Sequence, residues 1–217
     1  MPLPVSDGLV LQLETDSGLS AAGSTVVSWK DASGSGNDLT AVGDPSVSEA
    51  TTPSGALAIA FDGVDDRLER LAGLMALPLG NEARTVFFVV RYIDNEGVSS
   101  GFAYGDDQGN QTFGLVSSWD SADLELQGYG TNRDFGTTVP AAAQGWIVQS
   151  VTLSASQFQH YMNGTLIGSG TNQFATDLQQ IVIGAEIGGK GESKLEVAAV
   201  MVYDRALSAA EQTSVNS

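Results

Sequence analysis

Apolar and polar residues alternate along several stretches of the chain, and this period of two is typical of strands that bury one face. The alternation is clearest at Leu9, Leu11 and Leu13, at Leu57, Ile59 and Phe61, and at Phe102 and Tyr104. Denser runs rich in β-branched and aromatic residues predict central strands. These runs cover residues 85–92, 146–153, 181–184 and 197–203. The chain is therefore expected to consist mainly of β-strands.

Local turn and helix signals are few but specific. Asn163 and Gly164 stand between two alternating arms, and this dipeptide favours the type I′ turn of a β-hairpin. Two segments look helical: the apolar residues 71–77, and the C-terminus, where Ser208 and Glu211 have the spacing of a capping box. We therefore expect a hairpin at 163–164 and a short helix at the end of the chain.

The spacing of the strand signals indicates the fold class. Strands separated by turns at intervals of about 8 to 12 residues favour a β-sandwich or jelly roll over an α/β sheet. The sequence predicts an all-β fold, a two-sheet antiparallel β-sandwich forming one domain over residues 1–217, with a short C-terminal helix. Because a folded-looking segment follows the first methionine directly, we expect this domain to come from a larger protein.

The charge of the chain narrows the choice of partners. It has 9 lysine and arginine residues against 26 aspartate and glutamate residues, a net charge of −17. Nucleic acids attract positive charge, so no nucleic acid is expected as a partner, whereas a cation is. The scattered acids also fit a solvated surface. No apolar run reaches the length of a membrane span, so no membrane insertion is expected, and the lack of cysteine excludes disulfides.

Three segments together resemble the bacterial LamG-like (laminin G/pentraxin-like) domains of the concanavalin A-like lectin/glucanase superfamily. They are VVSWKDASGSGNDLT at 26–40, IAFDGVDDRLE at 59–69 and MVYDRALSAAEQ at 201–212. The resemblance implies a jelly roll of two antiparallel sheets, in which the N- and C-terminal strands meet. One departure is Ala199, which stands where such domains often carry an acidic residue before the tyrosine of the closing motif.

The sequence lacks the residues of a catalytic site. Hydrolases of the same superfamily use a strand-borne E-x-D-x-x-E motif, and this chain has none. Asp123 and Glu125 share a strand face, but no third carboxylate accompanies them as a glycosidase of this type requires. The single histidine, His160, falls in an ordinary strand, which favours a structural role over a catalytic triad. We expect no enzymatic activity.

Calcium (Ca²⁺) is the cofactor that the sequence supports best. The ion takes about six to eight oxygen ligands from carboxylates, amides, backbone carbonyls and water, and an acidic turn supplies them. The predicted ligands are Asp31, Asn37 and Asp38 in the first family-like segment, with Asp62 and Asp65 from the second. The alternative stays open, because aspartate, asparagine, serine and glycine also form turns by hydrogen-bonding their own backbone.

The segment 117–136 is the richest in side chains of the kinds that bind sugars, namely aromatic rings beside amides, carboxylates and arginine. Its predicted ligand-binding residues are Trp119, Tyr129, Asn132, Arg133 and Asp134. Aromatic residues of a sandwich also pack in the core or along an edge, and Trp29 and Trp146 are assigned to the core.

The resemblance, the acidic charge and the missing catalytic motif together predict a non-catalytic extracellular binding module. It would recognise carbohydrate or another cell-surface ligand, with calcium as a structural or ligand-bridging ion. The alternative is a structural or protein-interaction domain of a large adhesin or multidomain enzyme. Such a domain would contact neighbouring domains or peptides and bind no sugar.

Overall fold

The computed structural model describes residues 4–48, 52–94, 100–130 and 133–216, and most of its elements are strands. The strands are β1 (Leu9–Glu14), β2 (Leu19–Ala22), β3 (Thr25–Trp29), β4 (Leu39–Val42), β5 (Ser46–Ser48), β6 (Ala58–Asp62), β7 (Arg67–Arg70), β8 (Arg84–Tyr92), β9 (Ser100–Gly105), β10 (Thr112–Ser117), β11 (Asp123–Gln127), β12 (Asp134–Pro140), β13 (Ile147–Ser154), β14 (Gln157–Met162), β15 (Thr165–Thr171), β16 (Gln180–Ile183) and β17 (Lys194–Tyr203). The helical elements are α1 (Thr15–Gly18), the 3-10 turn η1 (Ala142–Gln144) and α2 (Ala209–Asn216). The predicted all-β fold with a short C-terminal helix is confirmed.

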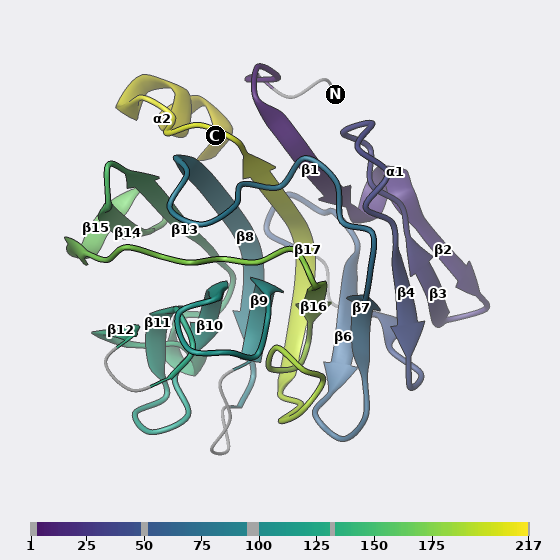
Figure 1. Ribbon diagram of the computed structural model, residues 1–217. Coiled ribbons are helices and arrows are strands. Elements are labelled where there is room, and N and C mark those ends of the chain that lie inside the picture. Colours follow the sequence, from purple (N-terminus) through teal and green to yellow (C-terminus); the bar gives the residue numbers. More distant parts are fainter. Residues whose placement is uncertain (1–3, 49–51, 95–99, 131–132, 217) are drawn as a thin grey trace.

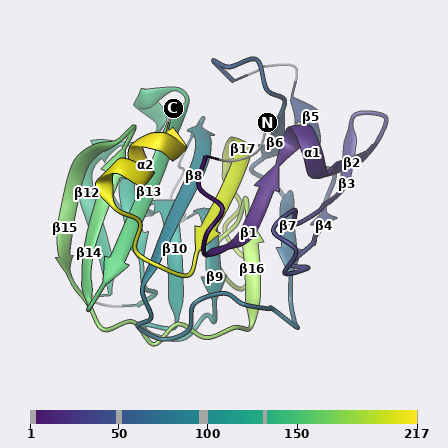
Figure 2. The same ribbon diagram turned by 90° about the horizontal axis from the view of Figure 1, so that it is seen from above.

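The strands form two antiparallel layers that pack face to face (Figure 1, Figure 2). In the first layer the order is β15-β14-β13-β8-β17, and β1 and β6 both pair with the other side of β17. In the second layer the order is β2-β3-β4-β7-β16-β9-β10-β11-β12. Strand β5 links the layers by pairing with β6 and β3. The pairing of β1 with β17 joins the two ends of the chain, as the resemblance implied.

The hydrophobic core lies between the layers, on the inward side of the alternating strands. Its large fully buried side chains include Trp29, Phe61, Phe88, Phe102, Tyr104 and Phe113. Burying one large apolar side chain contributes about 1.5–3 kcal/mol, so this interlayer core dominates the stability of the sandwich. The prediction that Trp146 belongs to it is wrong: the residue is half-buried, and the Arg91 guanidinium lies over its ring at 5.9 Å from the centroid. Ile147 begins the inward positions of β13 instead.

The two outer faces of the sandwich are covered differently. On the first layer, Phe87, Met201 and Tyr203 pack against Leu207, beside the chain termini and α2. On the second layer, the segment between β16 and β17 folds back, so that its Ala185 and Ile187 pack on Ala103 and Val182. The outer face over β10, β11 and β12 lies next to that segment and carries the candidate site.

Of the local predictions, the hairpin turn and the capping box are confirmed, and the helix at 71–77 is wrong. Asn163 and Gly164 have φ angles of 50° and 75°, as a type I′ turn requires, and they join β14 to β15. The capping box before α2 is also confirmed, because Glu211 Oε2 accepts the Ser208 N–H at 2.8 Å. The predicted helix at 71–77 is absent, and the left-handed φ of 61° at Ala76 is incompatible with one. Within the described residues, no helix is long and apolar enough to cross a membrane.

Candidate functional site

Strand β11 carries the residues around which the candidate site is built. Its Leu124 and Leu126 point inward and are fully buried in the core. Successive side chains of a strand face opposite sides, so Glu125 and Gln127 lie on the outer face of the second layer. This face belongs to the strands labelled β10 to β12 in Figure 1. A carboxylate and an amide thus stand two residues apart on the outer side of the sheet.

A glycine and a residue with a side chain flank each of these two positions. The antiparallel register places Glu125 between Val116 of β10 and Gly136 of β12, and Gln127 between Gly114 of β10 and Asp134 of β12. The Gln127 amide oxygen lies over Gly114, 3.5 Å from where a Cβ would stand. One contact comes from outside the strands: Gln127 Nε2 donates a hydrogen bond to Glu186 Oε1 at 3.2 Å. Glu186 belongs to the segment after β16, which therefore forms one border of the site.

Each of the two side chains keeps one acceptor atom without a partner. Glu125 is 6% exposed and Gln127 is 2% exposed, yet Oε1 of each accepts no hydrogen bond from any described residue. A buried polar atom without a partner costs about 1–3 kcal/mol, because it has given up water and gained nothing in return. They are two of thirteen such side-chain atoms among the described residues, and each has almost no accessible surface, so a ligand would reach them only after the groups around them had moved.

Charges of one sign surround this position. Burial, together with the nearby carboxylates of Asp134, Asp120 and Glu186, raises the pKa of Glu125 to about 7, although a hydrogen bond from Ser118 lowers it. The pKa values of Asp134 and Glu186 are also raised, in both cases mainly by burial. The site is therefore short of positive charge, and a cation or a hydrogen-bond donor would relieve it.

Two aromatic residues predicted from the sequence flank β11 along the chain. Trp119 lies in the turn between β10 and β11 and is 64% exposed. Tyr129 follows β11, has a left-handed φ of 68°, and packs against the cluster that covers β9 and β16. Asp134 fixes this turn, because its Oδ1 accepts the Tyr129 N–H at 2.9 Å. The structure thus brings Tyr129 and Asp134 together, with Trp119 at the opposite end of β11.

The remaining predicted ligand-binding residues do not join this group. Arg133 Nη1 donates to Asn172 Oδ1 at 3.2 Å, which ties the guanidinium to the segment after β15. Asn132 lies outside the described residues. The face around Glu125 therefore has no arginine from the predicted set.

The first predicted metal loop uses its acidic oxygens to hold its own backbone. Asp31 is 3% exposed; its Oδ1 accepts the N–H groups of Gln12 at 3.0 Å and Ser33 at 2.9 Å, and its Oδ2 accepts the Asn37 N–H at 3.0 Å. The Asp31 N–H in turn donates to Asp38 Oδ1 at 2.9 Å. These bonds are turn chemistry, the alternative that the sequence left open.

Asn37 has a second structural contact. Its side-chain amide donates to the Met75 carbonyl at 2.8 Å and accepts the Met75 N–H at 2.9 Å. This two-way bond fastens the segment 71–77 to the loop, and it explains why these residues follow the loop and do not form a helix of their own. All three predicted ligands of the loop thus have structural partners.

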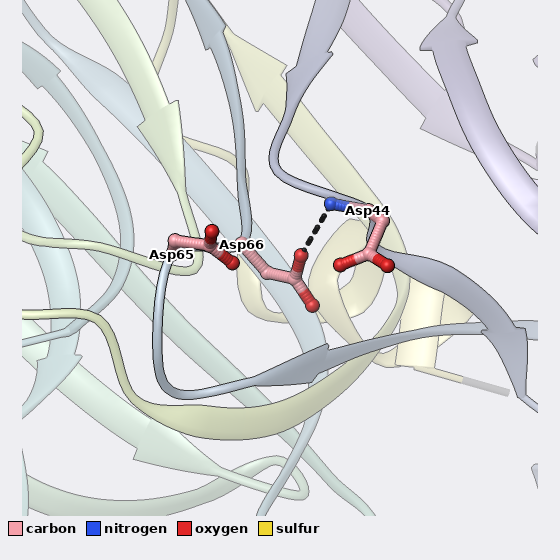
Figure 3. A group of neighbouring side chains, drawn as sticks. All are labelled: Asp44, Asp65 and Asp66. Carbon is pink, nitrogen blue, oxygen red and sulfur yellow. Dashed lines mark hydrogen bonds between the residues drawn. The ribbon is translucent and has the colours of Figure 1, made fainter.

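The second predicted metal loop contributes one residue to a carboxylate cluster. Asp65 lies with Asp44 and Asp66 so that one oxygen of each is within 4.8 Å of the others (Figure 3). Asp66 is held in place because its Oδ1 accepts the Asp44 N–H at 2.8 Å and its Oδ2 the Asp62 N–H at 3.0 Å. Asp62 is outside the cluster and accepts the Val64 N–H at 2.8 Å.

The cluster fits calcium in part. Gly43 lets the two loops approach, since a Cβ there would lie 2.6 Å from the Asp65 carbonyl oxygen. Burial raises the pKa of Asp66 above its usual value, although two backbone hydrogen bonds lower it. Three carboxylate oxygens are fewer than the roughly six to eight ligands of calcium, so carbonyls and water would have to supply the rest.

The sequence predictions did not include Gln127 and Glu186 as residues of the outer face, and they considered Glu125 only as a possible catalytic carboxylate. The alternation in DLELQ at 123–127 already places Glu125 and Gln127 on the face opposite the two leucines. The available signal was therefore a carboxylate and an amide at alternate positions of one strand. Glu186 had no such signal, because its place depends on how the segment after β16 folds back.

By sequence, residues 73–211 match the Laminin_G_3 family, described as "Concanavalin A-like lectin/glucanases superfamily". This match covers more than half of the chain, and the chain belongs to that family. No curated protein matches the sequence.

Several solved structures share the fold. Domain 4 of AbnA, a GH43 extracellular arabinanase from Geobacillus stearothermophilus in complex with arabinotriose, has a TM-score of 0.70 at 16% identity, covering 96% of this chain and 98% of that one. The binding domain of Paraclostridial Mosquitocidal Protein 1 has a TM-score of 0.70 at 15% identity, covering 97% and 52%. Trypanosoma rangeli sialidase in complex with sialic acid has a TM-score of 0.68 at 19% identity, covering 100% and 33%. The chain thus spans a third of the sialidase, and at these identities the likeness shows the fold alone.

Proposed function

We propose that this chain is a non-catalytic, extracellular carbohydrate-binding module, with its ligand on the outer face of β10, β11 and β12. One observation carries the proposal: Trp119, in the turn that leads into β11, is 64% exposed, and its ring offers an apolar surface for a sugar ring. Glu125 and Gln127 lie on the outer side of that strand, and their acceptor oxygens without partners would take sugar hydroxyls as donors if the groups that cover them moved aside. The similarly folded arabinanase domain in complex with arabinotriose supports this reading.

A buried carboxylic acid of raised pKa is also what a glycosidase uses as a general acid. Glu125 has such a pKa, about 7, and this observation favours hydrolysis as the second candidate function. The proposal nevertheless remains non-catalytic, because the strand-borne E-x-D-x-x-E motif of the family's hydrolases is missing. The two candidates are separated by incubating any bound oligosaccharide with the protein and following product release by chromatography; we expect none.

Calcium dependence stays a prediction. Asp44, Asp65 and Asp66 are the best-placed residues to hold the ion, and they lie in the β4–β5 and β6–β7 connections, not among the residues of the β11 face. We therefore expect a structural ion, whose removal weakens the fold more than it weakens the binding of sugar.

A glycan array followed by calorimetry, each with calcium and with a chelator, tests the proposed function. At least one glycan class should bind, and Trp119→Ala and Glu125→Gln should both weaken it. Asp16→Asn serves as the control, because Asp16 is exposed in α1 and its change alters the net charge equally. If no glycan on the array bound, carbohydrate binding would be contradicted, and the alternative would remain, namely a domain that contacts neighbouring domains or peptides.

A further inference from the structure

We propose that the outer face of β13, β14 and β15 carries a second binding site, a groove that takes a neutral oligosaccharide. The site goes beyond the proposed function, because β13, β14 and β15 belong to the first layer and β11 belongs to the second (Figure 1, Figure 2). The two layers pack face to face, so their outer faces point to opposite sides of the sandwich. Three features support the site: a groove, the side chains that line it, and the lack of charge around it.

The groove has a volume of about 520 Å³. Pockets that hold small ligands have volumes of about 300–1,000 Å³. Leu153 of β13 and Phe158 of β14 point into the core, so the side chains on either side of them point outward. Six outward side chains line the groove, and all but the first are exposed: Thr152, Ser154, Gln157, Gln159, Ser169 and Thr171. A ligand can therefore reach them without any movement of the sheet.

The antiparallel register arranges these six side chains in two rows across the strands. One row consists of Thr152, Gln159 and Ser169, and the next consists of Ser154, Gln157 and Thr171. Neighbouring strands lie about 4.8 Å apart, and alternate residues of one strand lie about 7 Å apart, so the rows cover about 10 Å by 7 Å. One oligosaccharide can thus contact both rows together.

The lining side chains match sugar hydroxyls in their hydrogen bonding. Four of them are hydroxyls and two are amides, and every one can both donate and accept. Among the described residues, none of the six side chains has a hydrogen-bond partner. Sugar hydroxyls also donate and accept, so they can pair with this mixture, whereas an ion requires groups of one kind. The chemistry of the groove therefore favours a ligand rich in hydroxyl groups.

The surroundings of the groove exclude a charged ligand. Residues 135–176 contain no aspartate, glutamate, lysine or arginine, so all 26 acidic and 9 basic residues of the chain lie elsewhere in the sequence. No charged residue from any other element lines the groove either. The single histidine of the span, His160, is 1% exposed and belongs to the inward side. A charged ligand would lose water here and meet no opposite charge, which disfavours it relative to a neutral one.

Other segments hold the turn at one end of the groove in place. Ala155, which lines the groove, and Ser156 have φ angles of 48° and 70°, a region that residues with side chains adopt at a cost. Ser156 Oγ accepts a hydrogen bond from Asn81 Nδ2 at 2.7 Å, and its carbonyl accepts the Asn172 N–H at 2.8 Å. The turn therefore positions Ser154 and Gln157 before a ligand arrives, and this lowers the cost of ordering the site.

The test compares neutral and charged tetrasaccharides. Cellotetraose, xylotetraose and mannotetraose are titrated into nitrogen-15-labelled protein beside tetramers of galacturonic acid and glucosamine, and the amide signals are followed by NMR. At least one neutral probe should bind with a dissociation constant of about 0.1–1 mM, because neutral hydrogen bonds contribute modestly. The shifted amides should centre on residues 152–159 and 169–171. The affinity should be the same in about 0.05 M and 0.5 M salt, since screening acts only on charges.

Variants of exposed residues show whether the groove binds the probe. Gln159→Ala should weaken the neutral probe about fivefold, and the double variant Gln157→Ala with Gln159→Ala about twentyfold. Ser169→Val, which removes a hydroxyl and adds bulk, should act in the same sense. Gln179→Ala is the matched control, because Gln179 is an exposed glutamine just before β16 and outside the groove, and it should leave the affinity unchanged. The Tm should stay the same in all of them.

The outcomes separate the groove from the proposed function. If no neutral probe shifts the groove amides, or if the double variant keeps its affinity, the groove inference is wrong. Carbohydrate binding on the β11 face then stands if Trp119→Ala weakens a glycan. If the groove variants weaken binding and Trp119→Ala does not, the groove is confirmed and the β11 assignment fails. If the charged tetramers bind in the groove as tightly as the neutral ones, the inferred class of ligand is wrong.

Discussion

The loop of residues 31–38 and the outer face of β11 are both acidic, and their carboxylates are used in different ways. In the loop, both oxygens of Asp31 accept backbone N–H groups. On β11, Oε1 of Glu125 and Oε1 of Gln127 have no partner among the described residues. We therefore assign Asp31 to the fold and propose the β11 face for the ligand.

This difference shows what composition cannot reveal about acidic residues. The loop has the richer mixture of aspartate, asparagine, serine and glycine, and on composition alone it is the better ion site. The hydrogen bonds reverse this ranking. The oxygens of Asp31 already accept backbone N–H groups, whereas Oε1 of Glu125 and Oε1 of Gln127 accept none. Each prediction below changes one side of this comparison.

Asp31→Ala should give the largest effect on stability. It removes the acceptor of three backbone N–H groups, those of Gln12, Ser33 and Asn37, in a place that is nearly closed to solvent. At about 1–2 kcal/mol for each orphaned donor, we expect a loss of about 3–5 kcal/mol in the free energy of unfolding, measured by urea denaturation. Asp38→Ala, which orphans the Asp31 N–H alone, should cost about 1 kcal/mol. Equal and small losses in both variants would show that the loop is not held in this way.

Glu125→Gln should stabilise the protein at high pH. The folded pKa of about 7 lies above the usual glutamate value of 4.5, so the folded state prefers the protonated acid. Stability from this group is complete below pH 4.5 and is lost as the pH rises through 7, because the unfolded chain gives up the proton first. The wild type should therefore be about 3 kcal/mol less stable than Glu125→Gln at pH 8, and the two should converge near pH 4.5.

The histidine inside the sandwich gives an internal control for that pH series. Burial lowers the pKa of His160 to about 4, so its contribution has the opposite sign: stability is lost as the pH falls from 6.5 toward 4. In Glu125→Gln, the loss of stability toward low pH should remain, while the loss of stability as the pH rises through 7 should disappear. If the free energy of unfolding of Glu125→Gln differed from that of the wild type by the same amount at every pH, the loss of stability at high pH would not come from Glu125.

Trp119→Ala should weaken ligand binding without weakening the fold. The side chain is 64% exposed, so its removal should change the free energy of unfolding by no more than about 0.5 kcal/mol. Loss of the stacking surface should weaken glycan binding by about 1–2 kcal/mol in calorimetry. A large loss of stability with unchanged affinity would assign the ring to packing, as an ordinary aromatic residue of a sandwich.

Calcium should have the smallest effect, and on a different part of the molecule. If the cluster of Asp44, Asp65 and Asp66 binds the ion with a dissociation constant of about 10⁻⁴ to 10⁻³ M, then 1 mM calcium stabilises the fold by about 0.4–1.4 kcal/mol. The rise in Tm over a chelated sample should vanish in Asp66→Asn and persist in Asp38→Ala. If the rise in Tm persisted in Asp66→Asn and vanished in Asp38→Ala, the ion would bind in the loop of residues 31–38 instead.

The sequence predicted those parts of the molecule that depend on local pattern. Alternation located the strands, Asn163 and Gly164 located the hairpin, and Ser208 with Glu211 located the helix. The apolar residues 71–77 misled because Leu74 and Leu77 enter the core from an irregular segment while Leu71 is exposed, and Asn37 holds the backbone of Met75. Sequence pattern does not include such contacts between distant segments.

The site was harder to predict for the same reason. Glu125 was noted as an acid on a strand face, but the glycines opposite it and the Glu186 that binds Gln127 come from other strands and loops. Whether a side-chain oxygen of β11 has a hydrogen-bond partner depends on the register of β10, β11 and β12 and on how the segment after β16 folds back. Residue types therefore indicated the kind of ligand, and only the fold indicated which acids are free to bind it.

The most direct test is to titrate the glycan that scores best on the array into the wild type, Glu125→Gln and Asp38→Ala under identical conditions. Calorimetry should show a loss of about tenfold in affinity for Glu125→Gln and no change for the folded fraction of Asp38→Ala. The reverse pattern, with affinity lost in the loop variant and retained in the β11 variant, would contradict the assignment of the binding site to the outer face of β11.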